Sequence, residues 1–454
     1  MGNWEKRGGL IIKVTTKEQK HSPVGHIDPN HSALVIIDVQ NDFCHSSGLL
    51  KRAGFEVSQV QATAEKIRLM LERARHFGVF TVFVRSVYHD EALSKNFEEI
   101  CVHRNLPSRL CQAGSWGADW YNGIEPTDGP GEVSVTKHRF SAFLGTDFDL
   151  YLRSNNISTI IITGVNTGGS LDATLREGSF LDYRIVVPED CTTDSIPGSH
   201  AGLIKNTGET FGDVLSSDDI YAEWAGASPD VERSWLPNAK RGRVLTELNT
   251  RIDPKHTALV LIDLQNDFCN SKGAMGALGE DLSAAQTILP AVKNLLTGAR
   301  KSGVTVIHVK AEYGLDSASD VSLYSGNRVG ATECCRPGSW GAEFVDEARP
   351  LDSEHVVVKH RFSPFPDTRL ELLLRANGIR TVVVMGVATH CCVEATVRDA
   401  CHKDFYVVVA KDCCATRGRM RHLHEASLET MGLYFATVVP SDEILDTWEI
   451  GTTA

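Results

Sequence analysis

Short apolar runs alternate with segments of helical period along the chain, and the whole alternation occurs twice. ALVIID (33–38) and ALVLID (258–263) are short apolar runs rich in β-branched residues, as in strands buried on both faces. Each is followed by a segment of helical period that ends on a glycine, Val57–Gly78 or Leu282–Gly303. Further strands are expected at Phe80–Arg85, Val133–Lys137, Ser158–Gly164, Tyr183–Asp190, Val304–Lys310, His355–Lys359, Arg380–Gly386 and Phe405–Asp412. Further helices are expected at Phe148–Ile157 and Leu370–Ile379, and two more begin at Ser170 and Cys392. This pattern predicts mostly parallel sheets with helices on both faces.

The two halves also repeat one another residue by residue. HSALVIIDVQNDFC (31–44) returns as HTALVLIDLQNDFC (256–269), and VTKHRFSAF (135–143) returns as VVKHRFSPF (357–365). A register kept over so long a stretch indicates two copies of one domain. We therefore predict tandem α/β domains at 1–237 and 238–454, joined by the polar, proline-containing linker Ser228–Lys240.

Composition narrows the range of partners and compartments. The 454 residues carry a net charge of −12 without a clustered Lys/Arg tract, which argues against a nucleic acid or an anionic membrane as partner. No apolar run approaches the ~20 residues of a membrane span, and the N-terminus lacks a secretory apolar region. Twelve cysteines, several of them adjacent, favour reduced thiols in a cytoplasmic protein over a secreted, disulfide-bonded one. A small molecule is the expected partner.

Three polar residues of the second copy lie at or just beyond strand ends. Asp263 and Lys359 end apolar runs, and Cys392 follows a third. In such sheets ligands bind beyond the carboxyl ends of the strands. A lysine and a helix start would favour the thiolate, and Asp263 could accept the thiol proton. Taken singly, however, each residue also has an ordinary structural explanation, as a turn former, a solvated cation or a small buried side chain.

The combination of IDLQNDF (262–268), KHRFS (359–363) and GVATHCCVEAT (386–396) resembles the isochorismatase-like cysteine hydrolases, over nearly the whole chain and twice. The resemblance implies two tandem, Rossmann-type three-layer α/β/α domains. It also implies a catalytic triad of Asp263, Lys359 and Cys392 that hydrolyses C–N bonds of small amide, ureido or carbamoyl compounds through a thioester. A cis peptide at Val387–Ala388 and oxyanion donors at the amides of Ala388 and Cys392 are implied as well.

The first copy departs from this pattern at the nucleophile. It keeps Asp38 and Lys137, but GVNTGGSLDAT (164–174) places Ser170 where the second copy has Cys392. A serine hydroxyl is a weaker nucleophile than a thiol, so we predict that this site is degenerate. Since family members commonly dimerise, the silent copy is expected to act as a built-in partner in an internal pseudo-dimer. The sequence does not decide whether that pair dimerises again, although a homodimer is preferred.

Four further residues are candidates for the substrate-binding wall: Phe268, Trp340, Arg361 and Phe365. Arg361 would suit a substrate carboxylate, although a structural ion pair is an equally good role. Phe268 and Trp340 could instead serve core packing or a helix–sheet contact, and this role is preferred for Trp340. Cys391 is expected only to pack. The adjacent His390, Cys391 and Cys392 cannot all face one ion, and no phosphate-binding glycine loop follows the first strand. No metal or nucleotide cofactor is therefore expected.

Two other functions are alternatives to a cysteine-dependent amidohydrolase. Relatives that hydrolyse isochorismate, a vinyl ether, place glycine at the nucleophile position, and Cys392 argues against that chemistry. A non-catalytic scaffold is disfavoured because the Asp263, Lys359 and Cys392 set is complete. The substrate itself cannot be read from the sequence.

Overall fold

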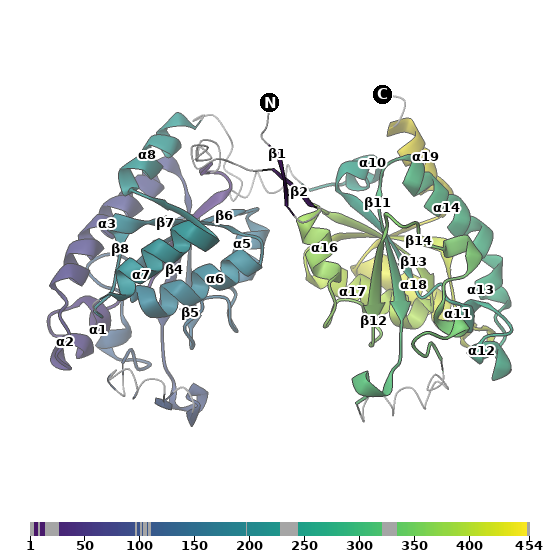
Figure 1. Ribbon diagram of the computed structural model, residues 1–454, viewed down its shortest axis with the longest axis horizontal. Coiled ribbons are helices and arrows are strands. Elements are labelled where there is room, and N and C mark those ends of the chain that lie inside the picture. The colour runs from purple at the N-terminus through teal and green to yellow at the C-terminus, as the bar shows by residue number, and fades with distance from the viewer. Residues whose placement is uncertain are drawn as a thin grey trace. The chain divides into compact units, whose positions relative to one another are not determined.

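The computed structural model describes residues 4–7, 10–13, 27–95, 98–99, 102, 107, 110–196, 198–227, 244–319 and 334–451. The chain divides into two compact units, Met1–Val244 and Leu245–Ala454 (Figure 1). The expected linker Ser228–Lys240, and with it the boundary between 237 and 238, lies outside the described residues. A short antiparallel hairpin, β1 (Trp4–Arg7) and β2 (Leu10–Lys13), precedes the first domain.

The second unit is built on a six-stranded sheet in which every neighbouring pair is parallel. Its order is β12-β11-β10-β13-β14-β15. The strands are β10 (Thr257–Ile262), β11 (Thr305–Ala311), β12 (His355–Lys359), β13 (Thr381–Val387), β14 (Tyr406–Ala415) and β15 (Thr437–Val439). The chain runs outward from β10 to β12 and then returns to begin again at β13. This order therefore has its topological switch point between β10 and β13, where ligands of such sheets bind.

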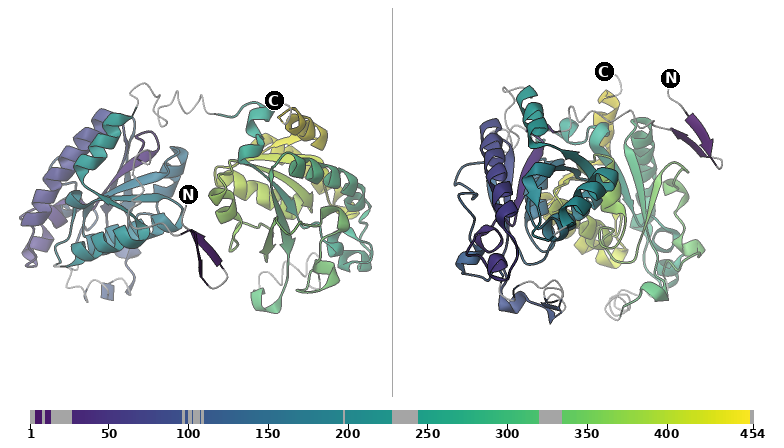
Figure 2. Two further views of the ribbon diagram at one scale, coloured as in Figure 1. Left: turned by 45° about the horizontal axis from the view of Figure 1, so that its top comes forward. Right: turned by 60° about the vertical axis from the view of Figure 1, so that its left-hand side comes forward.

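Helices cover both faces of this sheet, which confirms the expected three layers (Figure 2). One apolar core joins the sheet to α14 (Leu289–Lys301) and α19 (Ser441–Gly451), and another joins it to α16 (Leu370–Ala376), α17 (Glu394–His402) and α18 (Arg421–Tyr434). Strand β10 is buried along its whole length, because its side chains enter these two cores alternately. Shorter helices are α10 (Leu248–Arg251), α11 (Asn266–Cys269), α12 (Ala274–Ala277) and α13 (Ser283–Thr287).

The first unit has the same architecture. Its parallel sheet has the order β5-β4-β3-β6-β7-β9, with β8 paired to β6. The strands are β3 (Ser32–Ile37), β4 (Phe80–Ser86), β5 (Glu132–Lys137), β6 (Thr159–Val165), β7 (Arg184–Pro188), β8 (Thr192–Thr193) and β9 (Gly212–Leu215). The helices are α1 (Asn41–Cys44), α2 (Leu49–Arg52), α3 (Ser58–Phe77), α5 (Phe148–Ser154), α6 (Asp172–Phe180), α7 (Ser199–Asn206) and α8 (Ser217–Gly226).

One predicted helix of the second copy is interrupted. Its counterpart α3 runs unbroken to Gly78, which caps it in the left-handed conformation as expected. The segment Leu282–Gly303, however, forms two helices, α13 and α14. Pro290 lies in the first turn of α14 and cannot donate the backbone hydrogen bond that a continuous helix would need there. The expectation of a single helix was therefore wrong.

The central strands come unusually close together at the switch point. A Cβ atom on Gly386, at the end of β13, would lie 2.1 Å from the carbonyl oxygen of Ile262, and Gly164 has the same relation to Ile37. Directly after β10, Asp263 adopts a left-handed backbone with φ of 53°, and Asp38 does so in the first copy with φ of 58°. Such a conformation is less favourable for a residue other than glycine, and both copies adopt it at the same strand end.

Candidate active site

Three strands bring the predicted triad together at one edge of the second sheet. Asp263 directly follows β10, and Lys359 is the last residue of β12. Cys392 lies in a π-helical turn, Thr389–Val393, between β13 and α17. Strand β11 separates β12 from β10, and its last residue, Ala311, is the register partner of Lys359. Because the side chain of Ala311 is small, the lysine side chain can cross it toward Asp263.

The lysine amine contacts both of the other two side chains. Lys359 Nζ lies 2.8 Å from Asp263 Oδ2 and 3.4 Å from Cys392 Sγ. It also donates to the carbonyl oxygen of Arg361 at 3.1 Å. All three side chains are buried. A buried charge is tolerated only when it is paired, so the Asp263–Lys359 ion pair accounts for the presence of both charges here.

The electrostatics of the site differ from the expectation of a preformed thiolate. A hydrogen bond with Cys391, burial and the charge of Asp263 together raise the pKa of Cys392 well above its usual range, against the effect of Lys359. Burial raises the pKa of Asp263, despite the opposing charge of Lys359. Burial opposes the charge of Lys359, but Asp263 and Cys392 outweigh it and raise the pKa of Lys359 well above its usual range. These directions favour a protonated Cys392 thiol beside a charged Lys359 amine.

The loop after Asp263 is held by buried polar side chains. Gln265 donates to the carbonyl oxygens of Ala311 and Ala342 and accepts from the Ala311 amide, so it satisfies backbone groups of both residues. The carboxylate of Asp267 accepts from the amides of Ala274 and Cys335, at 2.7 and 2.6 Å. These bonds fasten α11 to the neighbouring loops and so help to fix the conformation around Asp263.

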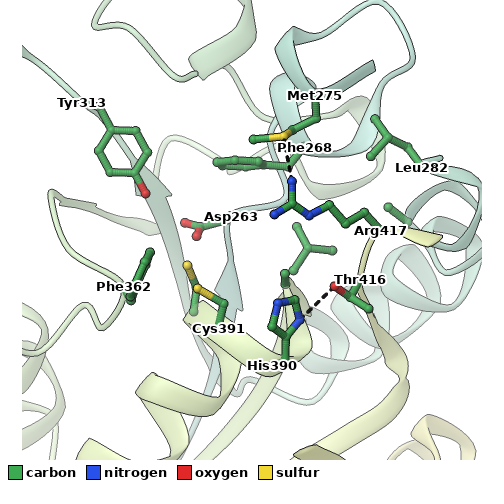
Figure 3. A pocket seen from close by; sticks show the side chains of 14 residues that line it. Asp263, Phe268, Met275, Leu282, Tyr313, Phe362, His390, Cys391, Thr416 and Arg417 are labelled. Carbon is green, nitrogen blue, oxygen red and sulfur yellow. Dashed lines mark hydrogen bonds between the residues drawn. The ribbon is translucent and has the colours of Figure 1, made fainter. Parts of the chain in front are cut away.

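A cavity opens beside Asp263 and Cys392, and Figure 3 shows it from close by. Most of its wall is apolar or aromatic, and a few polar groups lie at one end, where His390 Nδ1 is 3.0 Å from Thr416 Oγ1. The lining residues are Asp263, Phe268, Met275, Leu282, Ala285, Tyr313, Phe362, Val387, Ala388, His390, Cys391, Cys392, Thr416 and Arg417. A mostly apolar cavity with a few polar groups is typical of small-molecule sites.

Comparison with known proteins gives the same repeated domain. A sequence model described as "Isochorismatase domain" matches residues 32–219 and again residues 257–443, which together make up most of the chain. The chain belongs to the isochorismatase family. It is therefore a hydrolase of that family, and the two matched segments correspond to the two α/β units described above.

Curated relatives match about one copy. A ureidoacrylate amidohydrolase, RutB, of Acinetobacter baylyi is 28% identical over 234 residues, 48% of this chain and 95% of that protein. The RutB of an Enterobacter species is 33% identical over 181 residues, 37% of this chain and 78% of that protein.

Among solved structures, an isochorismatase-like hydrolase from Alkaliphilus metalliredigens is 26% identical and covers 42% of this chain and 99% of its own, with a TM-score of 0.35. An N-carbamoylsarcosine amidase from Thermoplasma acidophilum is 28% identical and covers 41% of this chain and 97% of its own, also with a TM-score of 0.35.

The peptide geometry implied by the isochorismatase-like resemblance is present. The bond Val387–Ala388 is cis, directly before the turn that carries Cys392. The amides of Cys391 and Val393 both donate to the Ala388 carbonyl oxygen, at 3.0 and 3.3 Å. In the first copy the corresponding Asn166 adopts the left-handed conformation, with φ of 66°.

Only one of the four residues expected to bind substrate lines the cavity, and the other three need correction. Phe268 lines it. Phe365 is buried in the apolar core between the sheet and α16–α18, where its ring packs 6.3 Å from that of Phe405. Arg361 is exposed and donates to the carbonyl oxygens of Ser317 and His360, so it holds a loop. Trp340 is 48% exposed and is not among the lining residues.

Several lining residues were not predicted. Tyr313 lies two residues beyond the end of β11, and Thr416 and Arg417 directly follow β14. The same strand-end argument that selected Asp263 and Lys359 would have found them. Cys391, expected only to pack, lines the cavity, and its hydrogen bond with Cys392 lowers the pKa of Cys391.

The corresponding groups of the first copy form a closed network instead. Lys137 Nζ lies 3.1 Å from Asp38 Oδ2, 2.9 Å from Ser170 Oγ and 2.7 Å from Ser86 Oγ. The Ser86 hydroxyl also donates to Asp38 Oδ1 at 2.9 Å. Ser86 takes the position of Ala311, since each is the register partner of the lysine. Lys137 and Asp38 are thus both bound to a hydroxyl that the second copy lacks.

Proposed function

We propose that the second copy hydrolyses a C–N bond of a small amide, ureido or carbamoyl compound through a thioester on Cys392. The observation that carries this proposal is the position of Lys359 Nζ, in contact with both Asp263 and Cys392, which themselves line a cavity. The name of the curated relatives, ureidoacrylate amidohydrolase, supports the same bond type.

In the first half of the reaction, Cys392 Sγ attacks the carbonyl carbon and the thiol proton passes to Asp263. Negative charge then develops on the carbonyl oxygen, where the backbone amides of Ala388 and Cys392 are proposed to donate hydrogen bonds. The tetrahedral intermediate collapses, the C–N bond breaks, and the proton on Asp263 moves to the leaving nitrogen. Lys359 remains charged throughout and holds Asp263 in place.

In the second half, water attacks the carbonyl carbon of the thioester while Asp263 accepts its proton. The C–S bond breaks, the acid is released, and Asp263 returns the proton to the Cys392 sulfur. The raised pKa of Cys392 is compatible with this order, because the proton leaves only as the carbon–sulfur bond forms.

We further propose that the first copy is silent. Its nucleophile position is a hydroxyl, and its lysine and aspartate are already engaged by Ser86. Its role would then be to support the second copy as an internal partner.

The test is intact-protein mass spectrometry of the full chain after incubation with a panel of amides, ureides and carbamates. A transient acyl adduct is expected on the wild type and on Ser170→Ala, which is the matched control in the first copy, but not on Cys392→Ala. If no compound is turned over, and iodoacetamide labels Cys392 no faster than it labels the other cysteines, the thiol mechanism is wrong. Turnover that survives Cys392→Ala would instead support chemistry carried directly by Asp263.

A further inference from the structure

An ion pair closes the polar end of the cavity. Arg417, a lining residue, donates from Nη1 to Glu280 Oε1 at 3.0 Å, and the two side chains are each only 11% exposed. Figure 3 shows the guanidinium pointing into the cavity beside Met275 and Phe268. The same Nη1 lies 3.7 Å from the Met275 sulfur.

Two loops hold this pair in place. Glu280 belongs to the loop between α12 and α13, and Arg417 to the loop that follows β14. The Gly418 amide donates to the carbonyl oxygen of Asp281 at 2.9 Å, so the loops are also joined through their backbones. A Cβ atom on Gly418 would approach Asp281 Oδ2 to 2.6 Å, which shows how closely they pack.

Two other titratable side chains near the pair are Arg419 and His390. Arg419 Nη2 contacts the same Glu280 oxygen at 2.7 Å, but its side chain is 56% exposed, so solvent screens its charge. The neighbouring His390 has a pKa lowered by burial and by the charge of Arg417, and it is therefore neutral near pH 7. Glu280 thus offsets the charge of Arg417 beside the cavity.

The pair belongs only to the copy that carries the thiol. In the sequence register of the repeat, Glu280 corresponds to Phe55 and Arg417 to Ser195. The aromatic positions of the wall are kept, since Phe268 and Tyr313 correspond to Phe43 and Tyr88. The two copies therefore share the aromatic residues of the wall, whereas the charged pair beside the cavity is found only in the second copy.

From this arrangement we infer that Glu280 is a specificity-determining residue that makes the site prefer uncharged substrates with an apolar body over substrates that carry a carboxylate. This inference rests on the proposed function. A substrate carboxylate directed at Arg417 would share one guanidinium with Glu280, and the two anions would lie side by side among apolar side chains. Like charges brought together in such surroundings repel one another strongly. An apolar substituent would instead pack on Phe268, Met275 and Leu282 without that cost.

The test compares two amides that differ only at the far end, 3-(4-methylphenyl)propanamide and 3-(4-carboxyphenyl)propanamide. Ammonia release gives kcat/KM for each on the full-length protein. We expect the wild type to favour the methyl compound by about tenfold or more. Glu280→Gln keeps the shape of the side chain and removes the competing charge, so it should shift the ratio toward the carboxylate by about tenfold. The double variant Glu280→Gln/Arg417→Gln should lose that shift.

The ratio of the two kcat/KM values is the readout, so a general loss of activity from a loosened loop does not imitate the effect. A wild type that prefers the carboxylate, with an acyl adduct still forming on Cys392, overturns this inference and leaves the proposed function intact. An unchanged ratio in Glu280→Gln also overturns it. If neither amide nor any member of the wider panel acylates Cys392, the proposed function fails together with the inference.

Discussion

In the first copy the amine of Lys137 lies 2.7 Å from the hydroxyl of Ser86, whereas the residue in register with Lys359 in the second copy is Ala311. This hydroxyl accepts from the lysine and donates to Asp38, so it occupies both groups that would assist a nucleophile. The first copy therefore differs from the second in the partner of its lysine as well as in the missing thiol.

Because of this difference, we predict that introducing a thiol alone does not make the first copy reactive toward substrates. In a Cys392→Ala background, Ser170→Cys is expected to show no acyl adduct, because Ser86 still binds Asp38 and Lys137. The double change Ser86→Ala/Ser170→Cys should be alkylated by iodoacetamide at the introduced thiol about tenfold faster than the single change, as expected when about 1.4 kcal/mol of competing hydrogen bonding is removed. Peptide mass spectrometry of both variants measures this, and equal labelling rates would contradict the role given to Ser86.

The pH dependence of kcat/KM is expected to follow Asp263 on the acid side. Burial raises the pKa of this carboxyl, and only its ionised form can accept the thiol proton. Activity should therefore fall as the pH drops through a pKa above the ~3.9 of an exposed aspartate. Between about pH 7 and 9 the profile should be flat, because Cys392 reacts as the neutral thiol and the pKa of Lys359 is higher still. A rate that rises tenfold per pH unit across that interval would indicate a preformed thiolate instead.

The neighbouring thiol is expected to restrain Cys392. Its hydrogen bond is the first cause of the raised Cys392 pKa, so Cys391→Ala should lower that pKa and speed alkylation of Cys392 at pH 7. The labelling rate at Cys392, followed by mass spectrometry of its peptide as a function of pH, checks the direction. Cys401→Ala, on the following helix α17 and outside the cavity lining, is the matched control and should leave the rate unchanged. Slower labelling in Cys391→Ala would mean that Cys391 lowers the pKa of Cys392 rather than raising it.

Two equivalent glycines allow the contribution of each copy to be separated. A Cβ atom on Gly341 would lie 2.1 Å from Asp267 Oδ2, and one on Gly117 would lie 2.1 Å from Asp42 Oδ2. Either alanine substitution should displace its buried carboxylate and lower the free energy of unfolding of its own copy by about 1–3 kcal/mol. Only Gly341→Ala should reduce kcat/KM strongly, because only that loop adjoins the proposed catalytic site. Urea unfolding and steady-state kinetics of both variants decide this, and an equal loss of activity in Gly117→Ala would argue that the first copy takes part in catalysis.

The strand and helix pattern could be predicted because strands such as β10 are buried on both faces and therefore read as continuous apolar runs. Asp263 and Lys359 could be located because parallel strands end at one edge of the sheet. The interruption at Pro290 was missed because the apolar period continues across it, although the proline itself was visible in the sequence.

The wall of the cavity was harder to predict. Arg361 and Phe365 follow Lys359 closely along the chain, but the structure directs one to a loop carbonyl and the other into the core. Sequence proximity does not determine side-chain direction in an irregular segment. The Glu280–Arg417 pair joins loops that are 137 residues apart, a contact that no local pattern contains.

The reach of Lys359 across Ala311 also limits which cation can serve in this fold. Neighbouring strands lie about 4.8 Å apart, so a charge carried by β12 must pass over one whole strand before it meets a group at the end of β10. A histidine at the same position is too short to cross that distance. The spacing of the strands therefore favours lysine at this position, in addition to any requirement of the proposed reaction. The side chain there must be long enough to cross one whole strand.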